Sequence, residues 1–461
     1  MPDIELERPP EVEDVDETAQ PFKRLAAVLI VSITFFGAIV GYLQTVASNE
    51  EEEAARDGNI AAVTGFSTQV DANTRFRSAY DVYIESKLIQ QRQLIAHNRS
   101  LLVQDPVATL ESARWQNVRQ SFEQLSPLLS EERYKDESDP RFPERFGADV
   151  NLDPNKARLQ QAARAELVED FGGKADAYVA VLTVLAVSLF LIGLSMTVVG
   201  RGRRFLFIPG VGLALSCVLW AALITAREVS RTPARAINAV AEGDRLAEQK
   251  RFDEAIEAYT EALDARPDYG TAFGRRADAH FLEGSPQAAV NFVSITDAES
   301  LKRAIADGED AVENGAENDL SVVASLGFQY FLAKDYSKAA RFTSDALELN
   351  DQRPELWFNR GVIELARGNN DEALDAYAEA VRLTAALPFE FVRTDLFGAA
   401  RTDLEILASN ERARAKAAQS VQERITHAEA DLRVEGGLDD VPRGASVEGI
   451  ELAAEGNFVT A

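Results

Sequence analysis

Three long uncharged apolar segments constrain this chain more than any other feature. They cover 25–43, 177–200 and 205–226, and each is about as long as a helix must be to cross a hydrocarbon core of roughly 30 Å. We therefore predict three transmembrane helices, the first counted from Lys23 as 23–43. The first segment is too long for the apolar region of a signal peptide and no small-residue cleavage site follows it closely, so we expect it to remain as an anchor.

Positive charges near the ends of these segments predict their orientation. Lys23 and Arg24 precede the first segment, and the link 201–204 between the second and third carries three arginines. Both places fall on one side of a membrane crossed three times, and that side should be cytoplasmic. Residues 44–176 and all residues after 226 would then lie on the extracytoplasmic side of a bacterial inner (plasma) membrane, in a multi-pass protein.

Three further arginines oppose this orientation. Arg227, Arg231 and Arg235 follow the third segment on the side expected to be outside. We favour the first orientation because a short link with three arginines is hard to translocate. The inverted topology, with the residues after 226 in the cytoplasm, is the alternative.

The charge and cysteine content exclude some functions. The formal net charge is −27, so phosphate backbones would repel the chain and we expect no nucleic-acid binding. Cys217 is the single cysteine and lies in the third apolar segment, which rules out a disulfide within the chain. The acidity predicts a well-solvated surface.

The residues before the second span are predicted to form an acidic tail and a helical domain. Residues 1–22 are rich in carboxylates and cannot bury enough apolar area to fold, so we expect disorder there. Residues 44–176 show mostly helical periodicity. The predicted elements are a helix over 74–102, a helix over 106–129, a loop over 130–154, and a helix opened by Asp153-Pro154 that continues through Gly172 and Gly173 into the second span.

A spaced pattern of small and aromatic residues recurs between 233 and 388. Small residues stand where two helices would touch, an aromatic ring fills the gap between them, and the step from Ala339 to Ala373 is 34 residues. The pattern comprises Gly243, Ala255, Tyr259, Ala262 and Pro267, then Gly327, Tyr330, Ala339 and Ala346, then Trp357, Gly361, Gly368, Ala373, Tyr377 and Ala380.

These segments resemble tetratricopeptide repeats, which are helix–turn–helix units of 34 residues. The resemblance implies an all-α solenoid with repeats at about 236–269, 270–319, 320–353 and 354–387. The second repeat departs from the pattern, because about 16 extra residues stand between its helices around 285–299. Its second helix would be 300–315. The front half resembles, by arrangement alone, uncharacterised bacterial membrane proteins with three spans.

The resemblance also implies which residues line a concave groove that binds a protein or peptide partner. The groove positions of the family fall on Arg275, Asp278, Phe281, Leu282, Phe328, Phe331, Leu332, Phe358 and Asn359. Asn359 matches an asparagine with which some relatives grip a terminal carboxylate, but the basic partners of that clamp are mostly missing here. We therefore expect a partner with apolar anchors, bound as an extended or helical peptide.

A long helix is predicted after the repeats, over 389–434, followed by a loose tail over 435–461. Its first part, with an apolar face, would cover the exposed end of the array, whereas 411–433 looks polar nearly all round. An alternative to partner binding is that the groove aromatics pack against this helix.

No pattern of catalytic chemistry was found. His97, His280 and His427 lie far apart, and no phosphate-binding loop, zinc-protease motif or nucleophile elbow is present. We expect no enzymatic activity, no cofactor and no metal ion.

Three functions fit these features. The preferred hypothesis is a membrane-anchored scaffold or adaptor that binds a protein partner through its repeats. The first alternative is a membrane sensor in which 44–176 receives a signal. The second is a structural subunit that forms homo-oligomers through small-residue faces of its spans, such as Gly37 with Gly41 or Gly212 with Ser216.

Overall fold

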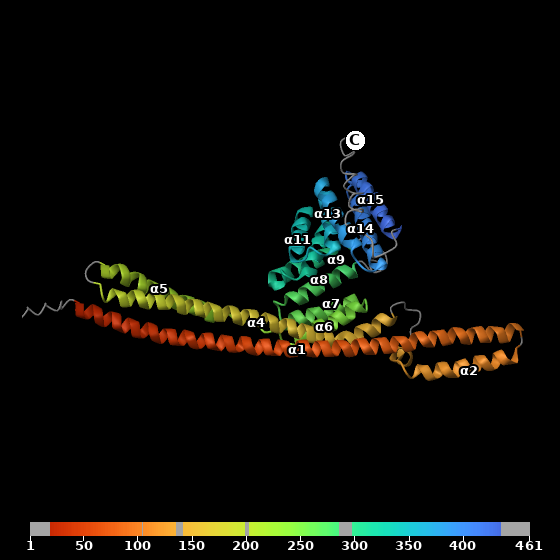
Figure 1. Ribbon diagram of the computed structural model, residues 1–461, viewed down its shortest axis with the longest axis horizontal. Helices are drawn as coiled ribbons and strands as arrows, with labels where there is room; N and C mark the ends of the chain where they lie inside the picture. The colour runs from red at the N-terminus through yellow and green to blue at the C-terminus, as the bar shows by residue number, and fades with distance from the viewer. Residues whose placement is uncertain (1–18, 104, 135–141, 199–201, 285–296, 435–461) are drawn as a thin grey trace, which may run out of the picture. The chain divides into compact units, whose positions relative to one another are not determined.

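The computed structural model describes residues 19–103, 105–134, 142–198, 202–284 and 297–434. Within these ranges the chain is all-α, as predicted, and contains no strand (Figure 1). The chain divides into two compact units, one of residues 1–68 and 157–231 and the other of residues 69–156 and 232–461. Most of the predicted acidic tail, most of the insertion in the second repeat, all of the loose C-terminal tail and Arg201 of the basic link lie outside the described residues.

Helix α1 (Ala19–Val103) is a single helix of 85 residues (Figure 1). It joins the predicted first span and the predicted helix 74–102, which the sequence analysis treated as separate. One buried residue recurs every seven positions through its first half, because seven residues nearly complete two turns. These residues are Ala26, Ile33, Val40, Ala47, Ala54 and Ala61. Most are alanines, so this buried face is weakly hydrophobic and its periodicity is hard to see in the sequence.

Helix α4 (Phe142–Ser195) packs against α1 in the first unit. A Cβ atom added to Gly65 would lie only 3.3 Å from the Cβ of Ala157, so small residues allow the two backbones to approach closely. The helix runs without a break through Gly172 and Gly173 into the second apolar segment, which confirms the predicted continuity.

The prediction of a loop over 130–154 was wrong. Helix α4 already begins at Phe142, and Pro154 lies inside it although proline cannot donate a backbone hydrogen bond. The turn before Pro154 is held by tertiary packing, because Phe146 is buried against Tyr134 and Ala79. Packing therefore outweighs the local preference of the proline.

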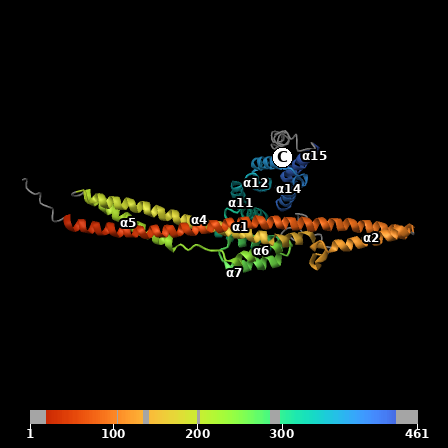
Figure 2. The ribbon, with the colours of Figure 1, turned by 60° about the horizontal axis from the view of Figure 1, so that its bottom comes forward.

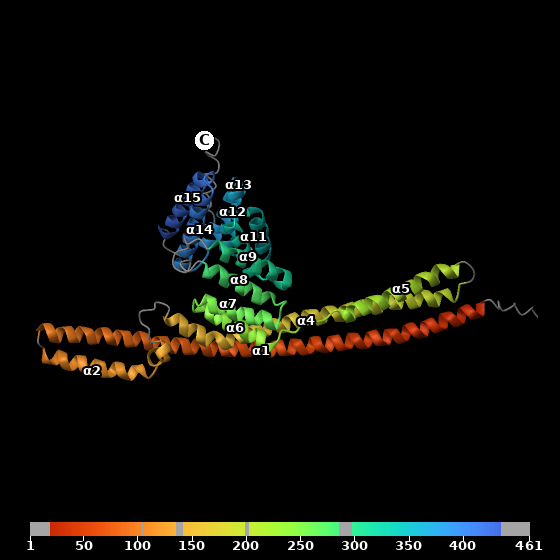
Figure 3. The same ribbon diagram turned by 180° about the vertical axis from the view of Figure 1, so that it is seen from behind.

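The first unit contains three helices that are long and apolar enough to cross a membrane, judged by length and composition. They are the start of α1, the end of α4 and α5 (Gly202–Ala226), and α4 and α5 run side by side in Figures 1 and 3. The Ser188 hydroxyl donates a hydrogen bond to the Gly210 carbonyl over 2.6 Å. Gly37 contacts Leu185, whereas Gly41 and Gly212 have open space where a Cβ would be.

Charged residues pair at one end of this helical bundle. Arg227 lies 3.2 Å from Asp170, and Arg231 lies 2.5 Å from Glu50. Glu50 follows the first apolar segment, Asp170 precedes the second and Arg227 follows the third. At the opposite end, Phe22 packs edge-on against Phe207 with ring centroids 5.0 Å apart.

In the second unit, α2 (Pro106–Glu123) folds back along the end of α1 (Figures 1 and 2). The predicted helix 106–129 is shorter than expected, because Ser126 and Pro127 begin a new turn, α3 (Pro127–Ser130), followed by η1 (Glu132–Tyr134). The Ser126 hydroxyl donates to the Ala79 carbonyl over 2.8 Å. This bond ties the loop to α1.

The repeats form four pairs of antiparallel helices. The first helices are α6 (Ala234–Glu248), α8 (Gly270–Glu283), α10 (Leu320–Leu332) and α12 (Pro354–Arg367), and the second helices are α7 (Phe252–Ala265), α9 (Ala298–Ala311), α11 (Tyr336–Leu349) and α13 (Asn370–Ala385). The small positions are buried as the pattern predicted: a Cβ on Gly361 would lie 2.7 Å from the ring of Tyr377. Helix α9 continues as a π turn, η2 (Val312–Ala316), in which Gly315 has a φ of 93°.

The predicted helix over 389–434 is two helices. Helix α14 (Glu390–Asn410) ends where Glu411 leaves the helical conformation, and α15 (Ala415–Val434) packs back on it (Figure 3). The part that looked polar carries a buried row of small and aliphatic residues at steps of three and four: Ala418, Val421, Ile425, Ala428 and Leu432. The pair covers the last repeat, because its buried residues join the same core as those of α12 and α13.

Candidate partner-binding site

The first helices of the repeats bring polar side chains together on their inner face. The Nε atom of Arg275 on α8 lies 3.6 Å from the carboxylate of Asp244 on α6. Asp244 also accepts a hydrogen bond from the Tyr259 hydroxyl over 2.8 Å. Asp278, one turn after Arg275, hydrogen-bonds to Ser325 on α10. The structure therefore joins the predicted groove residues Arg275 and Asp278 in one network across three helices.

The balance of charge in this network is negative. Asp244, Asp278 and Asp319 interact with Arg275, which provides the positive charge of the group. Burial raises the pKa of Asp278 to about 6, against the opposing effect of Arg275 and Ser325. A desolvated group with an excess of carboxylates favours the approach of a cation.

Aromatic rings adjoin the polar network. The ring of Phe281 on α8 meets that of Phe328 on α10 edge-on, with centroids 6.3 Å apart, and Phe328 in turn lies 5.9 Å from Phe331. Phe281 and Phe328 are half-buried, whereas Phe331 is only 3% exposed. The accessible aromatic surface therefore comes from Phe281 and Phe328.

Phe358 lies elsewhere in the fold. Its side chain is 3% exposed and sits between Phe397 of α14, at 6.0 Å, and Tyr377, at 6.1 Å. The alternative interpretation, that groove aromatics pack against the C-terminal helices, is correct for Phe358. Phe331 and Phe358 thus stabilise the core and cannot reach a partner without moving. Asn359, next to Phe358, is half-buried.

The inner face of the first repeat is contacted by the start of α4. Asn155 donates a hydrogen bond to Asp244 over 2.8 Å. The Asp149 carboxylate accepts three hydrogen bonds: from Nη1 of Arg245 over 2.9 Å, from Nε2 of Gln249 over 3.0 Å and from the Tyr134 hydroxyl over 2.5 Å. The chain's own helix therefore already contacts part of the groove, which leaves α8 and α10 as its accessible section.

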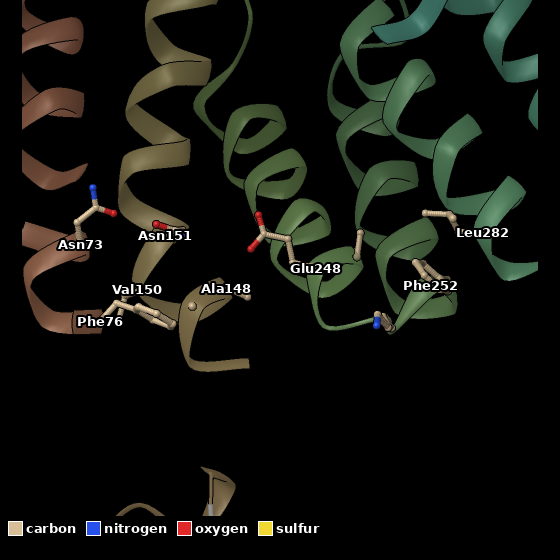
Figure 4. Close-up of a pocket in the computed structure, with 11 residues that line it drawn as sticks. Asn73, Phe76, Ala148, Val150, Asn151, Glu248, Phe252 and Leu282 are labelled. Atoms are coloured by element: carbon tan, nitrogen blue, oxygen red, sulfur yellow. The ribbon is translucent and has the colours of Figure 1, made fainter. Parts of the chain in front are cut away.

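A pocket of about 610 Å³ adjoins this contact. Figure 4 shows its wall, with Asn73 and Phe76 on α1, Ala148, Val150 and Asn151 on α4, and Glu248, Phe252 and Leu282 on the repeat helices. The lining is mainly apolar, with two amides and the charged residues Glu248 and Lys250. A volume of this size suits a small organic ligand.

The histidines do not form a site with one another. His280 is nearly buried, 3.4 Å from Glu283 and 3.8 Å from Asp307, whose carboxylate also pairs with Arg276 at 2.7 Å. Among the described residues, no group of three His, Cys, Asp or Glu side chains is arranged to hold a metal ion. Burial lowers the pKa of His280, which fits a packed, neutral imidazole.

Several residues of the site were not predicted from the sequence. Asp244 and Ser325 stand at positions 9 and 6 of their repeats, counted from 236 and 320, so the same alignment could have found them. Asp149 and Asn155 carry no such signal, because they belong to no repeat. Asp149 lies in the segment interpreted as a loop, and Asn155 lies in the helix predicted to begin at Asp153-Pro154.

A sequence model of one known family, the tetratricopeptide repeat, matches residues 240–293 and 333–388. These two segments are similar to tetratricopeptide repeats. The match covers most of α6, all of α7 and α8, and α11 to α13, whereas α9 and α10 lie outside it. It agrees with the resemblance seen in the sequence. Tetratricopeptide repeats generally mediate protein–protein interaction. A comparison with curated protein sequences finds no match.

Proposed function

We propose that this tetratricopeptide-repeat chain is a membrane-anchored scaffold that binds a protein or peptide partner through the inner face of α8 and α10. The observation that carries the proposal is the adjacency of accessible aromatic rings, Phe281 and Phe328, to the negative network of Asp244 and Asp278. Aromatic rings bury a large apolar area in a partner contact.

The chemistry of the groove indicates what the partner carries. The rings would accept an aliphatic or aromatic side chain, and the carboxylates would favour a lysine or arginine close to it. Arg275 is engaged by Asp244, so a partner carboxylate would have to compete for it. We therefore expect a peptide segment with apolar and basic residues.

The test is capture of a partner by the full-length protein in mild detergent. The double variant F281A/F328A should lose the partner, whereas F389A/F391A should retain it. Phe389 and Phe391 are a matched control, because they form an exposed aromatic pair with centroids 5.7 Å apart outside the groove. Equal capture by both variants would refute the groove assignment.

The proposed placement has the three apolar helices in a bacterial inner membrane and the repeats outside the cytoplasm. The three arginines in the short link 201–204 support it, because positive charges in a short loop are retained on the cytoplasmic side. Protease added to spheroplasts should cleave the repeats. Protection of the repeats until the membrane is lysed would favour the inverted topology.

A second candidate function is ligand sensing, and the pocket beside Phe76, Val150 and Phe252 favours it. A ligand there would touch α1, α4 and the first helices of the repeat array. Screening of small apolar compounds against the full-length protein should find one that raises its melting temperature. The variant V150W, which fills the pocket, should abolish that shift if the pocket is the site.

A further inference from the structure

The pocket beside the start of α4 has two apolar walls on opposite sides. Phe76 on α1 and Val150 on α4 form one wall. Phe252 on α7 and Leu282 on α8 form the other (Figure 4). Gly147 lets the ring of Phe76 lie against α4, since a Cβ there would be only 3.4 Å from the ring. The cavity of about 610 Å³ therefore has room for an apolar group between the walls.

Three carboxamide side chains form a cluster beside the α1–α4 wall. Nε2 of Gln69 donates to Oδ1 of Asn73 over 3.2 Å and to Oδ1 of Asn151 over 3.3 Å. Asn73 and Asn151 both line the pocket. Because their oxygens accept from Gln69, each amide keeps its Nδ2 group as a donor. Neither Nδ2 group has a hydrogen-bond partner among the residues that the structure describes. The pocket thus offers N–H donors to an oxygen atom of a ligand.

The formal charges at the pocket cancel. Glu248 and Lys250 are its charged lining residues, one of each sign. The whole chain has a formal net charge of −27, so an anionic ligand would approach against the field of the protein. Moving a charged group from water into a mainly apolar pocket also costs much more free energy than moving a neutral carbonyl group. These charges favour a ligand without a net charge.

We infer that the pocket binds a neutral acyl compound, which is a hydrocarbon chain that ends in an ester or amide carbonyl group. The hydrocarbon chain lies between the two apolar walls, and the carbonyl oxygen accepts hydrogen bonds from Nδ2 of Asn73 and of Asn151. This inference rests on the second proposed function, ligand sensing at the same pocket, and adds the chemical class of the ligand.

The length of the hydrocarbon chain tests the apolar walls. Isothermal titration calorimetry of the full-length protein in mild detergent should give a Kd for octanamide about tenfold below that for hexanamide, because each buried methylene group strengthens binding roughly fourfold. The variant V150W, which fills the pocket, is the control for uptake of the compounds by detergent. It should bind octanamide at least about tenfold more weakly, and equal titration curves for the parent and V150W would overturn the inference.

The carbonyl group is tested by removing its donors. Asn73→Asp keeps an oxygen acceptor for Gln69 but lacks the Nδ2 donor, so it should weaken octanamide binding by about tenfold. Asn98→Asp is the matched control, because it adds the same charge at an exposed position of α1 outside the pocket and should bind octanamide like the parent.

The charge of the ligand is tested with octanoate, which should bind the parent at least about tenfold more weakly than octanamide. Octanoate binding as tightly as octanamide, or Asn73→Asp binding octanamide like the parent, would overturn the neutral acyl compound as the ligand while leaving ligand sensing intact. Ligand sensing itself fails on a different result, namely that no screened compound of any class shifts the melting temperature.

Discussion

The carboxylate of Asp149 lies 2.9 Å from the Nη1 atom of Arg245, and this ion pair joins α4 to the first helix of the repeats. Both side chains are less than a fifth exposed. Asp149 also accepts hydrogen bonds from Gln249 and Tyr134. One carboxylate on α4 therefore connects η1 and the first helix of the repeats, α6.

Replacement of Asp149 by alanine should loosen this connection. The change leaves the Gln249 amide without its acceptor and leaves Arg245 with Glu242 alone, in a largely dehydrated place, so we expect a loss of about 1–3 kcal/mol. Hydrogen exchange of α6 amides should become faster, and the melting temperature should fall. Glu254→Ala is the control, because Glu254 pairs with Arg251 on an exposed surface, where an ion pair contributes little, and the change in stability should be much smaller. Equal effects of the two variants would contradict the role given to Asp149.

Alanine substitutions at Gly361 and Gly398 should change the stability of the protein in opposite directions. A Cβ at Gly361 would lie 2.7 Å from the buried ring of Tyr377, so Gly361→Ala should destabilise the protein by about 1–3 kcal/mol. Gly398 lies inside α14 with nothing within 4 Å of an added Cβ. Gly398→Ala should therefore stabilise the protein by up to about 1 kcal/mol. Chemical unfolding followed by circular dichroism measures both, and two changes of the same sign would refute the packing argument.

The repeat pattern and the apolar segments were visible in the sequence because their physical causes are local. A small residue facing an aromatic ring, as Gly361 faces Tyr377, lies within one helix pair and recurs at fixed spacing. The length of α1 was not visible, because alanines such as Ala54 and Ala61 form its buried face and give little hydrophobic contrast.

The burial of Phe358 and the role of Asp149 depend on distant partners. Phe358 packs on Phe397, which belongs to a helix whose position the repeat pattern does not specify. Asp149 meets Arg245 across 96 residues of sequence. Arg275, Asp278, Phe281 and Phe328 could be placed from the repeat alignment alone, since their neighbours are adjacent inner helices.

The turns inside the repeats offer a test of backbone conformation. Lys334 and Gly368 occupy the same turn position, 34 residues apart, with positive φ values of 63° and 94°. A side chain costs about 1 kcal/mol in this left-handed region, and glycine does not. Lys334→Gly should thus stabilise the protein by about 0.5 kcal/mol. The gain is less than the full 1 kcal/mol because glycine also raises the conformational entropy of the unfolded chain. Gly368→Ala should destabilise it, also because its Cβ would crowd Arg414. Thermal unfolding distinguishes the two, and a stabilising Gly368→Ala would contradict the assigned conformation.

Asp403 on α14 should make stability depend on pH. Burial raises its pKa from 3.8 to about 8, so the folded protein holds a proton that the unfolded chain releases above pH 4. The contribution of this group to stability should therefore be largest below about pH 4. It should decrease as the pH rises to about 8, by at most about 1.4 kcal/mol per pH unit.

Asp403→Asn removes the titration while keeping the shape of the side chain. The variant should be more stable than the parent at pH 8, and the difference should shrink at pH 5. Denaturant midpoints at the two pH values measure this, with Asp375→Asn on the exposed face of α13 as the control. If Asp403→Asn gave the same midpoint shift at both pH values, the carboxyl group would have to be charged throughout that range, and the dry environment inferred for it between α14 and Tyr377 would be wrong.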